Sequence, residues 1–150
     1  MLSLGRLPLD SLPNRMLKRS LDIAGATFGL LISAPLLAVS ALLVQRESPG
    51  PIFFFQERVG RNGKKFHMLK LRTMHPDAAQ SDHLNQSTQR NDPRVLRVGS
   101  IIRKWNIDET PQFWNVLKGE MSLVGPRPER TYHISYLRDE IRHYNVRHTV

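Results

Sequence analysis

Two neighbouring carboxylates, Asp108 and Glu109, are the residues of this sequence best placed to do chemistry. They stand where a helix is predicted to begin, because Pro111 fits the first turn of a helix. The N-terminus of a helix favours anions, so a phosphate can also dock there. Simple capping of the helix is the plainer explanation, and for this pair taken alone it is the favoured one.

A stiff loop with one arginine follows this pair, in the segment Gly125-Pro126-Arg127-Pro128. The two prolines fix φ on either side of Arg127, so its planar guanidinium is presented by a rigid segment and suits a phosphate. A plain turn is the alternative. Phosphoryl transfer requires such a set, with Mg²⁺ held through carboxylates and arginines that neutralise charge. A carboxylate can also be the nucleophile and form an acyl phosphate.

Residues 23–44 form an uncharged apolar segment, whose length as a helix matches the ~30 Å hydrocarbon core of a bilayer. A cleaved signal peptide is disfavoured because the segment is too long. Pro35 is expected to break the helix, and Ser33 can satisfy a freed carbonyl. Basic residues flank both ends, which favours a re-entrant hairpin with both ends in the cytoplasm. A spanning helix remains an equal alternative on the residues alone.

The remainder of the chain is predicted to contain a small β-hairpin. Asn62-Gly63 separates the apolar and aromatic runs 52–59 and 65–72, which is a strong hairpin signal. The polar segment 75–93 has no apolar period and is expected to be a mobile lid or disordered.

Helices are predicted around and after the acidic pair. Apolar residues recur at helical spacing over 95–105. A second helix begins near Asp108 and is closed by Gly119 in the left-handed conformation. A third is expected over 129–143, with Pro128 well placed at its first position. The fold class is therefore mainly α with a small β-hairpin.

Three regions are expected along the chain. Residues 1–16 form an N-terminal flank, residues 17–46 the re-entrant or spanning membrane helix, and residues 47–150 a compact cytosolic catalytic domain.

Composition limits the chemistry and the partners. The net charge of +9 favours anionic partners, namely nucleic acid, phospholipid headgroups or a phosphorylated substrate. Because the chain has no cysteine, disulfides, thiolate metal sites and cysteine nucleophiles are excluded. The six histidines are scattered and form no H-E-x-x-H motif, so zinc is a remote alternative.

From Lys18 onward the sequence closely resembles the bacterial sugar transferase family, the monotopic polyprenyl-phosphate phosphoglycosyl transferases of exopolysaccharide and glycan assembly. The resemblance is specific because many segments match in order. They are KRSLD at 18–22, SPGP at 48–51, KLRTM at 70–74, NDPRV at 91–95 and DETPQFWNVLKGEMSLVGPRPE at 108–129.

The resemblance implies a re-entrant helix broken at Pro35 and an enzyme of two steps. Asp108 attacks the β-phosphorus of a UDP-sugar, expels UMP and passes the phosphosugar to undecaprenyl phosphate. Glu109, together with Asp108, is expected to hold Mg²⁺. The residues expected to bind substrate phosphates are cationic: Arg103 and Arg127, with Lys70 and Arg72 as looser candidates.

The resemblance also implies a place in the cell and a set of partners. The enzyme is expected at the bacterial inner membrane, with its catalytic domain on the cytoplasmic face. Anionic membrane lipids are further expected partners, nucleic acid is not, and a homodimer is left open.

The sequence departs from the family in two places. Ala34, rather than the usual serine, precedes Pro35, and the nearest serine is Ser33. The family also continues beyond Val150, which motivates a second hypothesis, a catalytically inactive truncated member. A third hypothesis is a basic protein that binds membrane surfaces or nucleic acid, motivated by a cluster of cations: Arg58, Arg61, Lys64 and Lys65.

Overall fold

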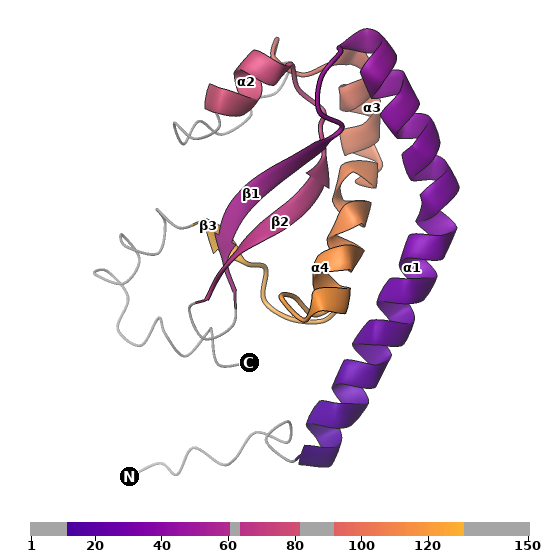
Figure 1. Ribbon diagram of the computed structural model, residues 1–150, viewed down its shortest axis with the longest axis vertical. Coiled ribbons are helices and arrows are strands. Elements are labelled where there is room, and N and C mark those ends of the chain that lie inside the picture. The colour runs from indigo at the N-terminus through magenta and orange to yellow at the C-terminus, as the bar shows by residue number, and fades with distance from the viewer. Residues whose placement is uncertain (1–11, 61–63, 82–91, 131–150) are drawn as a thin grey trace, which may run out of the picture.

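The computed structural model describes residues 12–60, 64–81 and 92–130 (Figure 1). The helix α1 lies along one side of a column formed by α3, η4 and α4, and the strands lie on the other side of that column (Figure 1). The expected fold class, mainly helical with a β-hairpin, is confirmed. The elements follow in the order α1 (Leu12–Glu47), β1 (Phe53–Val59), β2 (Lys65–Leu71), α2 (Pro76–Ser81), α3 (Arg97–Lys104), the 3₁₀-helix η4 (Ile107–Gln112), α4 (Phe113–Lys118) and β3 (Glu129–Arg130).

The helix α1 is continuous over 36 residues and includes Pro35. The expected break at Pro35 therefore does not appear as an interruption of the helix, although the helix is bowed along its length (Figure 1). Proline removes one backbone hydrogen bond and crowds the preceding turn, which bends a helix without ending it where the neighbouring turns persist. Ser33 is buried, and its hydroxyl donates to the Leu30 carbonyl at 3.4 Å.

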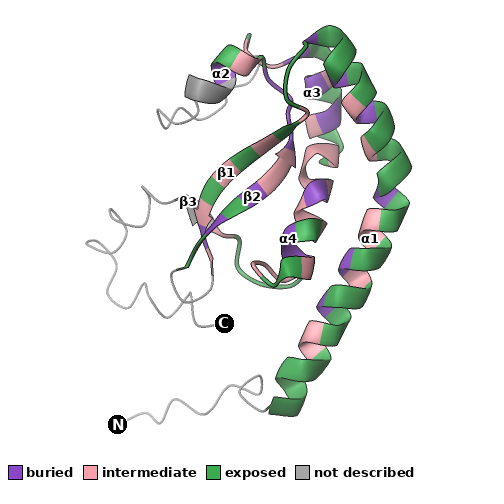
Figure 2. Ribbon diagram, viewed as in Figure 1, coloured by how far each residue is buried: buried purple, intermediate pink, exposed green. Residues whose placement is uncertain are grey.

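The two faces of α1 carry opposite kinds of side chain. The buried residues on the face toward the rest of the molecule are small or polar except for Val44, whereas large apolar residues such as Phe28, Leu31 and Leu42 are exposed. Figure 2 shows this outer face as mostly exposed along the helix. α1 is long and apolar enough to cross a membrane, and a soluble helix would bury the large apolar residues instead. This pattern indicates association with a membrane.

Two glycines allow α1 to pack closely on the column. A Cβ atom at Gly25 would lie 2.5 Å from Leu123 Cδ1, and one at Gly29 would lie 2.7 Å from the ring of Phe113. Both distances are too short for real contacts. The close approach therefore depends on the missing side chains, and it fixes α1 against α4 and the loop that follows it.

The sheet has the order β2-β1-β3. The predicted hairpin is confirmed, because β1 and β2 pair antiparallel from Phe53 opposite Leu71 to Val59 opposite Lys65. The helix predicted over 129–143 is wrong at its start, since residues 129–130 form β3 on the other edge of β1. That edge offers unpaired backbone groups, which a strand can satisfy. The remainder of that predicted helix lies outside the described residues.

The bounds of the other elements differ locally from those predicted from the sequence. The segment 75–93 was expected to lack structure, but α2 occupies residues 76–81, with Pro76 at its first position. The helix predicted over 95–105 is α3, at residues 97–104, and Val95 instead pairs with Met74 in an isolated bridge. Gly119 ends α4 with φ 84°, as predicted. The main apolar cluster joins α1, β2 and α3 through Val44, Leu71, Leu96 and Ile102.

Candidate active site

The acidic pair, Asp108 and Glu109, lies in the first turn of η4, between α3 and α4. Asn106 adopts a left-handed conformation with φ 54° and turns the chain from α3 into η4. Its carbonyl then accepts a hydrogen bond from the Glu109 N–H at 3.2 Å. Because η4 packs against β2 and α1, this turn holds the pair beside the end of the sheet.

Glu109 binds two cations from separate parts of the chain. Lys70 Nζ on β2 lies 2.9 Å from Glu109 Oε1, and Arg127 Nη2 lies 2.5 Å from the same oxygen. Burial alone would raise the pKa of Glu109, but the hydrogen bonds and charges of Lys70 and Arg127 outweigh burial and lower it. Glu109 is therefore held as an anion.

Asp108 has the opposite electrostatic environment. Burial raises the pKa of Asp108, and the neighbouring Glu109 charge adds to this effect, against the opposing charges of Lys70 and Arg103. Within the part of the chain that the structure describes, Asp108 forms no ion pair. The two adjacent carboxylates thus differ, because Glu109 is an ion-paired anion whereas Asp108 is desolvated and more basic. Such a difference is typical of catalytic pairs.

Lys70 and Arg127 contact the acidic pair, and Arg103 acts on it through its charge. Arg103 comes from the last turn of α3 and acts on Asp108 through its charge, while its Nε donates to Thr73 Oγ1 at 2.7 Å. Cations from a helix, a strand and a loop therefore converge on two carboxylates.

Arg72 lies outside this group. It is buried, and its guanidinium donates to the carbonyls of Ser48 and Pro49, at the turn that follows α1. β2 ends at Leu71, so strand alternation does not carry Arg72 to the side of Lys70. Its contacts give Arg72 a structural part in holding the end of α1.

The carboxylates of the acidic pair fit Mg²⁺ only together with ligands from a substrate. No group of three or more His, Cys, Asp or Glu side chains that could hold a metal occurs in the described ranges. Mg²⁺ is commonly bound through one or two carboxylates together with substrate phosphates. Asp108 and Glu109 can provide those carboxylates, whereas they cannot enclose an ion on their own.

A set of bonds at the start of α1 was not anticipated from the sequence. Arg19 donates to the carbonyls of Val116 and Leu117, each at 2.7 Å, and thereby caps the end of α4. Asp22 Oδ1 accepts from the Leu123 N–H and the Ser122 hydroxyl, each at 3.0 Å.

Lys18 completes this set by donating to Ser122 Oγ and to the Val124 carbonyl. We call Lys18, Arg19 and Asp22 the α1 clamp. The clamp fastens the loop of residues 119–128, which carries Arg127, to α1. Lys18 and Arg19 lie about one helical turn before Asp22, and this spacing ahead of the apolar segment was the available signal.

Comparison with known proteins places the sequence among sugar transferases. The profile of the family described as bacterial sugar transferase matches residues 13–150. A UDP-N-acetylgalactosamine-undecaprenyl-phosphate N-acetylgalactosaminephosphotransferase of Aeromonas hydrophila is 46% identical over 89% of this chain and 31% of its own length.

Two relatives share another printed activity, that of a UDP-glucose:undecaprenyl-phosphate glucose-1-phosphate transferase. The protein of Caulobacter vibrioides is 47% identical over 94% of this chain and 52% of its own length. The protein of Escherichia coli is 44% identical over 91% of this chain and 29% of its own length. The chain thus spans about half or less of each of these three relatives.

Proposed function

Because the chain belongs to the bacterial sugar transferase family, we propose that it transfers a sugar-1-phosphate from a UDP-sugar to undecaprenyl phosphate. The products are UMP and an undecaprenyl-diphospho-sugar, the first membrane-bound intermediate of exopolysaccharide or glycan assembly. The proposal is carried by one observation, the acidic pair whose two pKa values are shifted in opposite directions amid three converging cations.

In the first step, a carboxylate oxygen of Asp108 attacks the β-phosphorus of the UDP-sugar. The bond from that phosphorus to the bridging oxygen breaks, UMP leaves with the bonding electrons, and an aspartyl-phosphosugar remains. Burial supports this role for Asp108, because a group with a raised pKa is more basic and has less water to lose. Lys70, Arg103 and Arg127 lie where the charge of a diphosphate would be neutralised.

In the second step, a phosphate oxygen of undecaprenyl phosphate attacks the phosphorus held on Asp108. The bond between the phosphorus and the carboxylate breaks, which restores Asp108 and forms the new diphosphate. Glu109 remains ionised throughout and orients Lys70 and Arg127. Mg²⁺, held by Asp108, Glu109 and the diphosphate of the substrate, would supply further neutralisation of charge.

The contacts at the two ends of α1 support a re-entrant topology. Near its start, Arg19 binds the end of α4. At its last residue, Glu47 accepts from the backbone N–H groups of Arg97 and Val98 at 2.7 and 2.9 Å, at the start of α3. The whole apolar segment lies between these two contacts with one domain. A straight span would carry its ends to opposite sides of a core ~30 Å thick. We therefore propose that both ends lie on one side of the membrane, the cytoplasmic face of the inner membrane.

Radiolabelling tests the covalent step. Incubation with UDP-sugar labelled at the β-phosphate is expected to leave label on the wild-type protein, and Asp108→Asn is expected to abolish it. Asp77→Asn, in the first turn of α2, is the matched control and should be labelled as the wild type is. Label that survives in Asp108→Asn would rule out the assigned nucleophile.

Thiol labelling tests the topology. The chain has no cysteine, so single cysteines at the exposed positions Met16 and Gln45 report without background. A reagent that does not cross membranes should modify both in inside-out vesicles and neither in right-side-out vesicles. Modification of the two sites from opposite sides would show a spanning helix.

A further inference from the structure

A cavity of about 250 Å³ lies between the start of α1 and the loop 119–128. Its lining includes four cationic side chains and two acidic ones, so positive charge is in excess. Apolar side chains, among them Met121, Val124 and Pro126, form part of the remaining wall. The charged lining residues are Arg15, Lys18, Arg19, Arg127, Asp22 and Glu120.

The two acids of this cavity are held by other groups. Asp22 accepts from Ser122 and Leu123, as described for the clamp, and Glu120 Oε2 accepts from Asn115 Nδ2 at 2.6 Å. Asp22 also lies 3.8 Å from Lys18 and offsets its charge. The four cations still outnumber the two acids of the lining, so the cavity favours an anion.

Arg127 connects this cavity to the acidic pair. It lines the cavity, and its Nη2 binds Glu109 Oε1. Its side chain is 68% exposed, so it can reach a ligand without losing buried contacts. An anion in the cavity is therefore separated from Glu109, the neighbour of Asp108, by the side chain of Arg127.

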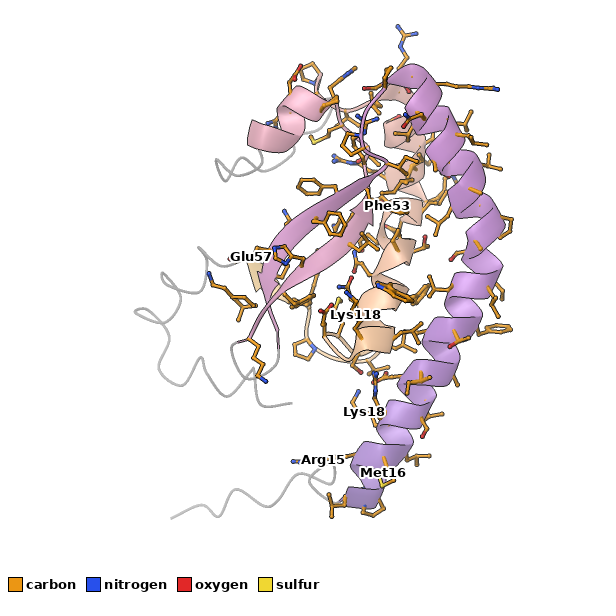
Figure 3. All side chains as sticks on the ribbon, in the orientation of Figure 1. Arg15, Met16, Lys18, Phe53, Glu57 and Lys118 are labelled. Atoms are coloured by element: carbon orange, nitrogen blue, oxygen red, sulfur yellow. The ribbon has the colours of Figure 1, made fainter. Side chains whose placement is uncertain are left out.

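The cavity also lies where an apolar chain can approach. Arg15 and Lys18 extend from the first turns of α1 (Figure 3). The same turns expose Leu17 and Leu21, and the loop exposes Val124. A ligand with an anionic head and a long apolar tail can thus place its head among the cations and its tail along the membrane-facing side of α1.

We propose that this cavity binds the phosphate monoester of the lipid acceptor, with Arg15 holding the head of the lipid beside Arg127. The inference rests on the proposed function and adds a second phosphate site to it, which shares Arg127 with the place proposed for the nucleotide diphosphate. From there a phosphate oxygen of the lipid attacks the phosphorus on Asp108, and the carboxylate leaves. Arg15 thus acts in the second step only.

Separate measurement of the two steps tests this site in the full chain in lipid vesicles. Arg15→Gln is expected to acquire label from UDP-sugar as the wild type does. The concentration of undecaprenyl phosphate that half-saturates loss of the label should rise about tenfold, as expected for one lost charged contact. Arg15→Lys should restore most of the affinity, and Arg46→Gln, exposed at the far end of α1, should change nothing. An unchanged half-saturating concentration in Arg15→Gln would overturn the proposal.

A binding measurement keeps this test independent of catalysis. A photoreactive polyprenyl phosphate is expected to crosslink to the Asp108→Asn chain. In the double variant, which also carries Arg15→Gln, the yield of crosslink should fall about tenfold. Phosphatidic acid, another lipid phosphate monoester, should compete, whereas inorganic phosphate at equal concentration should not. Equal competition by inorganic phosphate would show a site for free phosphate and overturn the lipid assignment. A failure of labelling with intact, Arg15-dependent crosslinking would refute the covalent step and leave the cavity supported.

Discussion

The acidic pair and the α1 clamp are both clusters of opposite charges, but they satisfy those charges differently. In the clamp, Arg19 and Asp22 are bonded largely to backbone groups, which cannot exchange partners without unfolding the loop. At the acidic pair, two cations share one oxygen of Glu109, and Asp108 is desolvated. Cations that share an oxygen can turn to a substrate phosphate at little cost. The comparison separates a cluster that holds the fold from one that is ready to react.

Replacement of Asp108 by Asn should give the largest effect and should act on turnover alone. Loss of the nucleophile is expected to lower the transfer rate by about 10³-fold or more. The melting temperature should not fall, because burial of this carboxyl opposes ionisation in the folded state. Transfer assays and thermal unfolding followed by circular dichroism measure the two quantities. A parallel loss of both would place Asp108 among the structural groups and remove the contrast with the clamp.

Replacement of Arg19 by Met, in contrast, should lower the stability of the fold. It removes two charged hydrogen bonds to the end of α4, and we expect the free energy of unfolding to fall by about 1–2 kcal/mol, because both carbonyls are only partly buried. Denaturant unfolding in detergent measures this change. Arg46→Met, at the exposed far end of α1, is the matched control and should stay within about 0.5 kcal/mol of the wild type. Equal effects of the two variants would show that the clamp does not hold the loop.

The pH dependence of stability distinguishes the two clusters further. Because the folded state raises the pKa of Asp108 above its ordinary value of 3.8, the folded protein binds the proton more tightly than the unfolded chain. Stability is then lost as the pH rises from about 3.8 through the folded pKa. The Asp108→Asn variant should therefore gain stability relative to the wild type over that rise and keep the gain at neutral pH. A stability difference that does not change with pH would contradict the desolvated environment of Asp108.

Local chemistry allowed several elements to be predicted from the sequence. Asn62-Gly63 indicated the hairpin because this residue pair between two apolar runs is a strong hairpin signal. Gly119 marked the end of α4 because it accepts positive φ. The structure brings Arg127 to Glu109, two residues that their types and the flanking prolines had marked, and their chemical roles stay predictions.

Features that depend on distant partners were predicted poorly. Whether residues 129–130 form a strand depends on the free edge of β1, which local sequence does not reveal. Arg72 resembled a phosphate ligand, yet it binds the carbonyls after α1, because β2 ends one residue earlier. The helix α1 likewise continues through Pro35, where the sequence predicted a break. In these cases tertiary contacts decide the conformation and the side-chain partners.

The smallest expected effect concerns Glu109, which combines features of both clusters. The pKa of Glu109 is lowered in the folded state despite burial, through Lys70 and Arg127. The ionised form of Glu109 therefore stabilises the fold above the ordinary pKa of 4.5. This contribution is lost as the pH falls through the folded pKa. Glu109→Gln should therefore be less stable than the wild type at pH 7 by about 0.5 kcal/mol, since Arg127 is largely exposed, and this difference should vanish in acid. Glu57→Gln, in an exposed pair with Lys65 at 3.1 Å, should show no difference at either pH. If Glu109→Gln were as damaging to stability as Arg19→Met, the ion pairs of Glu109 would hold the fold as the clamp does, and Lys70 and Arg127 would not be available to a substrate.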